Sequence, residues 1–158
     1  KALKMKTICD KYNVPLIIND NIDVCLAVDA NGVHLGSSDC DIAKARMILG
    51  NDKIIGASSR EVKTALLAQN AGADYLGVGA VFGTTTKSDA KAISKDILKE
   101  IANSVNSPVV AIGGITADNV SELKGCGIAG VAVVSAILKA QDIDSTTKDF
   151  VCKLKQIV

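Results

Sequence analysis

Residues 75–79 read Tyr75-Leu76-Gly77-Val78-Gly79, a short apolar run that directly follows Ala71-Gly72-Ala73-Asp74. The run is continuously apolar rather than alternating, which is typical of a β-strand that is covered on both faces. Similar runs, rich in Val, Ile and Leu, occur at residues 15–18, 32–35, 54–57, 109–112 and 131–134. The sequence therefore predicts six buried strands.

Segments of helical character separate and flank these runs. They cover residues 2–11, 22–28, 41–49, 59–70, 94–103, 117–124 and 145–157. Ser59 and Thr116 stand at two of the expected helix starts, where a hydroxyl can accept a hydrogen bond from a free backbone N–H. Strands that alternate with helices predict an α/β fold with a parallel sheet.

The length of the chain narrows the choice of fold. One strand–helix unit takes about 25 residues, so the 158 residues hold six units, whereas a closed (β/α)₈ barrel needs roughly 200 residues. We expect residues 1–158 to form one domain, or most of one, and six units are fewer than a (β/α)₈ barrel has. An open doubly wound sheet also fits the length, although no predicted strand is followed by G-x-G-x-x-G.

The composition excludes several classes of protein. Lys and Arg number 18 against 17 Asp and Glu, so no basic surface for nucleic acid is expected. No apolar stretch reaches the roughly 20 residues of a membrane span. The five cysteines are scattered without a C-x-x-C pair, which favours free thiols in the cytoplasm over disulfides or zinc.

Polar residues follow the predicted strands. In chain order they are Asn19-Asp20, Gly36-Ser37-Ser38-Asp39, Ser58, Gly83-Thr84-Thr85-Thr86-Lys87, Gly113-Gly114 and Ser135. In barrels and in open parallel sheets the carboxyl ends of the strands carry the functional site. We therefore expect these residues to lie at one edge of the sheet, although polar residues also follow buried strands for structural reasons alone.

Two acidic residues in this set suit a metal ion. Asp20 and Asp39 follow strands that are consecutive in sequence, and such strands usually lie side by side. Mg²⁺ prefers oxygen ligands and is commonly held by one or two carboxylates together with substrate oxygens. The alternative is that each carboxylate caps the helix that follows it.

Two loops have the chemistry of phosphate sites. Gly113-Gly114 lets backbone N–H groups approach an anion before the helix expected after Thr116, and Ser135 can add a hydroxyl and an N–H. Residues 84–87 combine three threonine hydroxyls with the cation of Lys87. Each loop can also be read as an ordinary turn or surface loop. His34, between Val33 and Leu35, fits a structural role better than a catalytic one on this pattern alone.

Taken in order, these segments resemble the thiamine-phosphate synthase family. The likeness runs from about residue 6 to residue 140, and Thr84-x-Thr86-Lys87 is its most discriminating part. The resemblance implies a transferase with the TIM (β/α)₈ barrel fold. It also implies that residues 1–158 are a single domain, a barrel truncated at its N-terminus that lacks the first two strands. Members of the family join hydroxymethylpyrimidine pyrophosphate to thiazole phosphate, forming thiamine phosphate and releasing pyrophosphate.

The resemblance also implies a role for each matching position. Asp20 and Asp39 would hold Mg²⁺. Asn19 and Lys87 would bind pyrophosphate, Ser58 would lie near the reacting centre, and His34 would border the pyrimidine pocket. Thr84, Thr86, Gly114, Val134 and Ser135 would bind the thiazole phosphate, with Gly114 and Val134 using backbone groups.

Some features depart from the family pattern. The family's Gln-x-Arg-x-Lys strand end has no counterpart here, and Ala80 and Gly83 stand where the family usually has prolines. Two other functions therefore stay open: a thiazole tautomerase-like isomerase on the same barrel, and a non-catalytic phosphate-ligand binder. The sequence also leaves homo-oligomers open, since unpaired sheet edges in a truncated barrel favour association.

Overall fold

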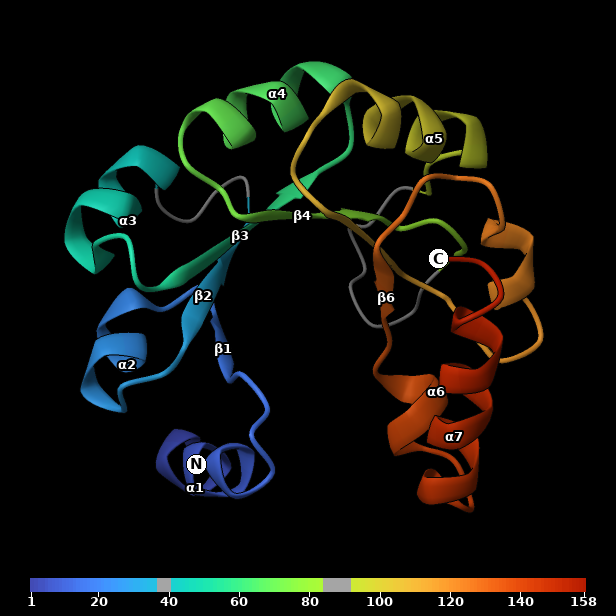
Figure 1. Cartoon of the computed structure of the whole chain (residues 1–158), viewed down its shortest axis with the longest axis horizontal. Helices are drawn as coiled ribbons and strands as arrows, with labels where there is room; N and C mark the ends of the chain where they lie inside the picture. Colours follow the sequence, from blue (N-terminus) through green and yellow to red (C-terminus); the bar gives the residue numbers. More distant parts are fainter. Residues whose placement is uncertain (37–40, 84–91) are drawn as a thin grey trace.

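A computed structural model of the chain describes residues 1–36, 41–83 and 92–158. Six parallel strands form one sheet in the order of the sequence. They are β1 (Ile17–Asn19), β2 (Gly32–Leu35), β3 (Ile54–Ser59), β4 (Tyr75–Gly79), β5 (Val109–Ile112) and β6 (Gly130–Ala132). Figure 1 shows the sheet curved into an arc, with β1 and β6 at its two ends.

This arrangement confirms the predicted part of a TIM barrel. A doubly wound sheet reverses its strand order at a switch point and carries helices on both faces. Here each strand pairs with the next one in the sequence, from β1 to β6. The alternative of an open doubly wound sheet is therefore wrong.

A helix occurs in each predicted helical segment, but several of these helices are shorter than predicted. They are α1 (Ala2–Lys11), α2 (Ile22–Ala27), α3 (Ile42–Leu49), α4 (Val62–Asn70), α5 (Lys95–Ser104), the 3₁₀ helix η1 (Val120–Leu123), α6 (Ser135–Leu138) and α7 (Ile143–Leu154). Within the described residues, none combines the length and apolar character that crossing a membrane requires. Figure 1 shows α2, α3, α4 and α5 outside the curve of the sheet, and α1 and α6 beyond its two ends.

Two predicted helix starts are wrong. Ser59 belongs to β3, because the strand continues to pair with Val78, and α4 begins later, after Glu61. The segment after Thr116 forms only the four-residue η1, and Thr116 donates its backbone N–H to Oδ1 of Asn119 at 2.8 Å. Neither hydroxyl caps a helix.

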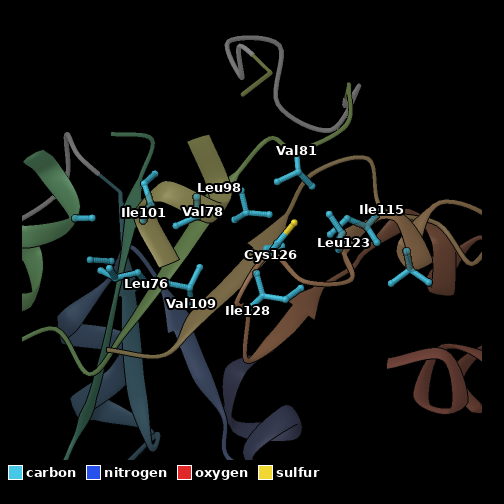
Figure 2. Packing of buried hydrophobic residues seen from close by; sticks show 14 of the residues in the cluster. Leu76, Val78, Val81, Leu98, Ile101, Val109, Ile115, Leu123, Cys126 and Ile128 are labelled. Carbon is cyan, nitrogen blue, oxygen red and sulfur yellow. The ribbon is translucent and has the colours of Figure 1, made fainter. Parts of the chain in front are cut away.

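The pleat of the strands divides their side chains between two faces. Residues such as Val33, Ile55, Leu76 and Ala111 are buried on the face that packs against the helices. Figure 2 shows the larger of two apolar clusters, in which Leu76, Val78 and Val109 meet Leu98 and Ile101 of α5. The side chains of the alternate strand residues lie on the inner face of the arc.

Candidate active site

The predicted site residues that the structure describes lie at the carboxyl edge of the sheet. Asn19 ends β1, His34 is the penultimate residue of β2, and Ser58 is the penultimate residue of β3. Gly114 lies two residues after β5, and Val134 lies two residues after β6. All six strands are parallel, so their carboxyl ends meet at this one edge.

Asn19, Asp20 and His34 form a connected group on β1 and β2. The side-chain amide of Asn19 donates to Oδ2 of Asp20 at 3.3 Å, and the backbone N–H of Asp20 donates to the carbonyl oxygen of His34 at 2.8 Å. Asp20 has a left-handed φ of 65°, which Asp and Asn tolerate better than most residues. Asn21, not Asp20, caps α2, through its Oδ1 and the N–H of Val24. The carboxylate of Asp20 is therefore exposed and is not used as a helix cap.

His34 joins this group to β3 and β4. Its Nε2 is 3.0 Å from Oγ of Ser58, and its Nδ1 is 3.0 Å from the phenol oxygen of Tyr75. The pKa of Tyr75 is raised by burial, so its hydroxyl keeps its proton at neutral pH. Sequence reasoning missed Tyr75. The sequence carries no signal for this contact, because it depends on the strand register, in which Tyr75 and His34 both pair with Gly56.

A hollow of about 190 Å³ opens on the inner face of the arc. Its lining comes from β1, β2, β4, β5 and β6 and consists of Ile17, Asn19, His34, Tyr75, Gly77, Val110, Ile112 and Ala132. The hollow therefore connects the Asn19–His34 side of the sheet with the ends of β5 and β6. Its mixed apolar and polar lining suits a small heterocyclic ligand.

The Gly113-Gly114 segment forms a tight turn at the end of β5. Both glycines have left-handed φ angles, 98° and 66°, and the amide of Asn119 donates to the carbonyl oxygen of Gly114 at 3.0 Å. A Cβ on Gly114 would collide with the carbonyl oxygens of Phe82 and Gly83. The helix expected to follow is only the short η1, so the predicted contribution of a helix dipole to an anion site is wrong, and the turn itself remains.

Val134 and Ser135 follow β6 and form the start of α6. Ile112 and Ala132 are paired in register, so Gly114 and Val134 stand at equal distances past two neighbouring strands. Both Val134 and Ser135 are exposed. The two segments thus leave the sheet side by side.

Four predicted residues lie outside the described residues: Asp39, Thr84, Thr86 and Lys87. The neighbouring segment is described, and it runs along the end of β5. The N–H of Val81 donates to the carbonyl oxygen of Ile112, and that of Phe82 donates to the carbonyl oxygen of Gly113, each at 3.0 Å. The residue that immediately precedes Thr84 therefore lies against the Gly114 turn.

Of the two carboxylates predicted to hold Mg²⁺, the structure describes that of Asp20. Within the described residues, no group of three His, Cys, Asp or Glu side chains could hold a metal ion. Mg²⁺ needs only one or two carboxylates when substrate oxygens and water complete its shell. The exposed carboxylate of Asp20 at the mouth of the hollow fits that requirement.

Arg60 adds a positive charge to the same edge and was not predicted. It follows β3, and its Nε donates to the carbonyl oxygen of Gly79 at 3.2 Å. Among the described residues its guanidinium forms no salt bridge. The group is therefore available to an anionic ligand at the carboxyl ends of β3 and β4.

The thiamine monophosphate synthase family model matches residues 1–137. A thiamine-phosphate synthase of Ruminiclostridium cellulolyticum is 57% identical over 147 residues, which are 93% of this chain and 70% of that protein. This chain belongs to the thiamine monophosphate synthase family. A thiamine-phosphate synthase of Methanobrevibacter smithii is also 57% identical, over 89% of this chain and 68% of that protein.

A solved structure agrees with the family assignment. The thiamine phosphate pyrophosphorylase of Pyrococcus furiosus superimposes with a TM-score of 0.91 at 39% identity, over 99% of this chain and 75% of that one. The predicted family, fold and transferase activity are thus confirmed. The roles of the individual thiamine-phosphate synthase site residues stay predictions.

Proposed function

We propose that the protein joins hydroxymethylpyrimidine pyrophosphate to thiazole phosphate, forming thiamine phosphate and pyrophosphate. Membership of the thiamine monophosphate synthase family supports these two substrates, and one structural observation supports the place of each. The inner hollow has the Asn19, Asp20, His34 and Ser58 group at one side and the ends of β5 and β6 at the other. Two ligands held at these two places would meet over the hollow.

The pyrophosphate would lie on the β1–β3 side. Asn19 has an amide that can donate to an anionic oxygen, and Ser58 is exposed with its hydroxyl held by His34. Lys87, outside the described residues, would add a cation. Arg60 stands at the same edge and can supply a further charge-assisted hydrogen bond.

Asp20 and Asp39 would hold Mg²⁺ beside the pyrophosphate. When bound, the ion neutralises charge on the departing group. The exposed carboxylate of Asp20 supports this assignment. The left-handed backbone at Asp20 turns the chain sharply away from β1, which leaves the carboxylate at the edge of the sheet.

The phosphate of the thiazole would lie on the β5–β6 side. The turn at Gly113 and Gly114 has left-handed φ angles, and the backbone of Phe82 and Gly83 packs where a Cβ of Gly114 would lie. The backbone N–H groups of the turn would bind the anion. Ser135 contributes a hydroxyl and an N–H from the neighbouring strand end. Thr84 and Thr86 follow Gly83, which contacts this turn, and they would add hydroxyl donors.

The chemistry follows from this placement. The C–O bond between the pyrimidine methylene and pyrophosphate breaks, and its electron pair leaves with the pyrophosphate oxygen. The lone pair of the thiazole nitrogen then forms the new C–N bond to the pyrimidine carbocation. No proton has to be removed, so no general base is needed. Orienting the two reactants and stabilising the leaving group account for the catalysis.

The test is a condensation assay with both substrates and Mg²⁺, in which thiamine phosphate is measured by chromatography. Asp20→Asn should lower the rate at least about tenfold, because one charged metal ligand is lost while the left-handed backbone is tolerated. Asp23→Asn is the matched control, since Asp23 is exposed three residues further on, in the first turn of α2. A chelator should stop the reaction, and added Mg²⁺ should restore it.

Two results would favour the other functions. Rearrangement of a single thiazole substrate without condensation would indicate the isomerase. Binding of thiazole phosphate without any product would indicate the non-catalytic binder. The free thiols of Cys9, Cys25, Cys126 and Cys152 support a location in the reducing cytoplasm. If that is correct, the protein should be fully active in a reducing buffer.

A further inference from the structure

Three side chains from three adjacent strands form a continuous hydrogen-bonded chain on the inner face of the sheet. Tyr75 on β4 contacts Nδ1 of His34 on β2, and Nε2 of His34 contacts Oγ of Ser58 on β3, both at 3.0 Å. His34 and Tyr75 are not on neighbouring strands, and β3 lies between them. Their contact therefore has to pass over a residue of β3.

Glycine at position 56 permits this contact. Gly56 is in register with His34 on one side and with Tyr75 on the other, and a Cβ at Gly56 would collide with the phenol ring. The two rings meet above it, with centroids 5.5 Å apart and planes tilted by 37°. The site is built so that Tyr75 reaches the histidine.

The partners of the Tyr75 hydroxyl indicate which atom donates in its hydrogen bond with His34. Nδ1 of His34 is the only hydrogen-bond partner of the Tyr75 hydroxyl among the described residues. If the phenol oxygen only accepted a bond, its own proton would have no protein acceptor, at a cost in free energy. The arrangement that gives this proton an acceptor within the protein has the phenol donating to Nδ1. A neutral imidazole that accepts at Nδ1 carries its proton on Nε2.

The tautomer of His34 decides what Ser58 can do. If Nε2 carries the proton, it donates to Oγ of Ser58, and the serine proton remains free for another acceptor. If Nε2 were unprotonated, Ser58 would donate to the ring and present only lone pairs to a ligand. Only the first arrangement gives Ser58 a donor for an anionic oxygen.

We propose that Tyr75 is a positioning residue that holds His34 as the Nε2–H tautomer, so that the hydroxyl of Ser58 donates a hydrogen bond to the pyrophosphate of the substrate. Tyr75 acts through His34 and does not touch the reacting atoms. The part concerning Ser58 rests on the proposed function, whereas the tautomer of His34 does not.

The tautomer can be measured without any activity assay. His34 is the single histidine of the chain, so ¹⁵N-histidine labelling gives one pair of ring-nitrogen signals. The signals are followed as the pH is raised until they stop changing, which marks the neutral ring. We expect Nε2 to show the shift of a protonated nitrogen and Nδ1 that of an unprotonated one. Tyr75→Phe should move both signals toward a tautomer mixture, while Tyr12→Phe, on the exposed end of α1, should change neither.

Kinetics test the connection to Ser58. Tyr75→Phe should lower kcat about ten- to hundredfold with a smaller change in KM, as expected for a misdirected hydrogen bond to a charged group. Ser58→Ala should cost at least as much. In the double variant, the second substitution should add almost nothing, because both remove the same interaction.

Each contrary result has one meaning. A wild-type spectrum with the proton on Nδ1, or an unchanged spectrum in Tyr75→Phe, overturns the inference whatever the kinetics show. Equal losses from Tyr75→Phe with and without Ser58 overturn the coupling between them. An unchanged rate in Ser58→Ala, together with the expected spectrum, contradicts the proposed function of Ser58 and leaves the tautomer assignment standing.

Discussion

Gly77 lies directly against the imidazole of His34, and a Cβ on Gly77 would come within 2.8 Å of Cε1 of that ring. Gly77 is in register with Ser58 on the neighbouring strand, so the glycine leaves room for the ring where His34 bonds the serine. The space around the histidine therefore depends on residues without side chains on both β3 and β4.

Gly77→Ala should displace His34 and weaken its bond to Ser58. We expect a loss of about 1–3 kcal/mol in the free energy of unfolding, as is usual for an overpacked site, together with an at least about tenfold fall in kcat. Gly130→Ala is the control, because that strand glycine has nothing within 4 Å of its added Cβ. Equal activity in the two variants would show that the added methyl group of Gly77→Ala does not displace the His34 ring.

Gly114→Ala tests the turn assigned to the thiazole phosphate. The substitution adds left-handed strain, about 1–2 kcal/mol, and a collision with the carbonyl oxygen of Phe82. KM for thiazole phosphate should rise several-fold more than KM for the pyrimidine substrate. Gly125→Ala carries similar strain, at φ 76°, with open space around its Cβ, so it should lower stability without changing either KM.

Asp74 should matter for stability rather than for the reaction. It precedes β4, at the amino end of the sheet, where Oδ2 accepts from the backbone N–H of Ile55 at 2.7 Å and from Arg46 at 2.6 Å. Asp74→Ala leaves the N–H of Ile55 without this acceptor, which should cost about 1–3 kcal/mol in urea unfolding. Asp144→Ala, which breaks only an exposed pair with Lys148, should cost less than about 0.5 kcal/mol. A changed KM in Asp74→Ala would contradict this separation.

Stability should fall at alkaline pH partly because of Tyr75. Burial raises the pKa of Tyr75 above its ordinary value of about 10, so the unfolded chain loses this proton first as the pH rises. The unfolded state then binds fewer protons than the folded state, and the free energy of unfolding decreases from about pH 10 up to the folded pKa. Burial also raises the pKa of the Cys25 thiol, whose effect begins at lower pH.

The contribution of Tyr75 is obtained by difference. Urea unfolding of the wild type and of Tyr75→Phe across this pH range should give a shallower decrease for the variant. Parallel curves would mean that the ionisation of Tyr75 is equally easy in both states.

The local errors of sequence reasoning have a common cause. Ser59 and Thr116 have the residue type of a helix cap, but pairing with the neighbouring strand keeps Ser59 in β3, and the side chain of Asn119 holds the segment after Thr116. Capping preferences describe a helix end by itself, whereas tertiary contacts decide where that end falls.

The sequence by itself determined the six strands, their parallel direction and the family resemblance, because continuous apolar runs and the residues that follow them are local patterns. The order of the strands in the sheet came from the structure. It also placed Asn19, Asp20, Ser58 and Gly114 at one edge of the sheet. Only the tertiary structure joined Tyr75 to His34 and Ser58, which are 41 and 24 residues away from the histidine in the chain. That contact depends on strand register and on the space left by Gly56 and Gly77, and both are set by packing between strands.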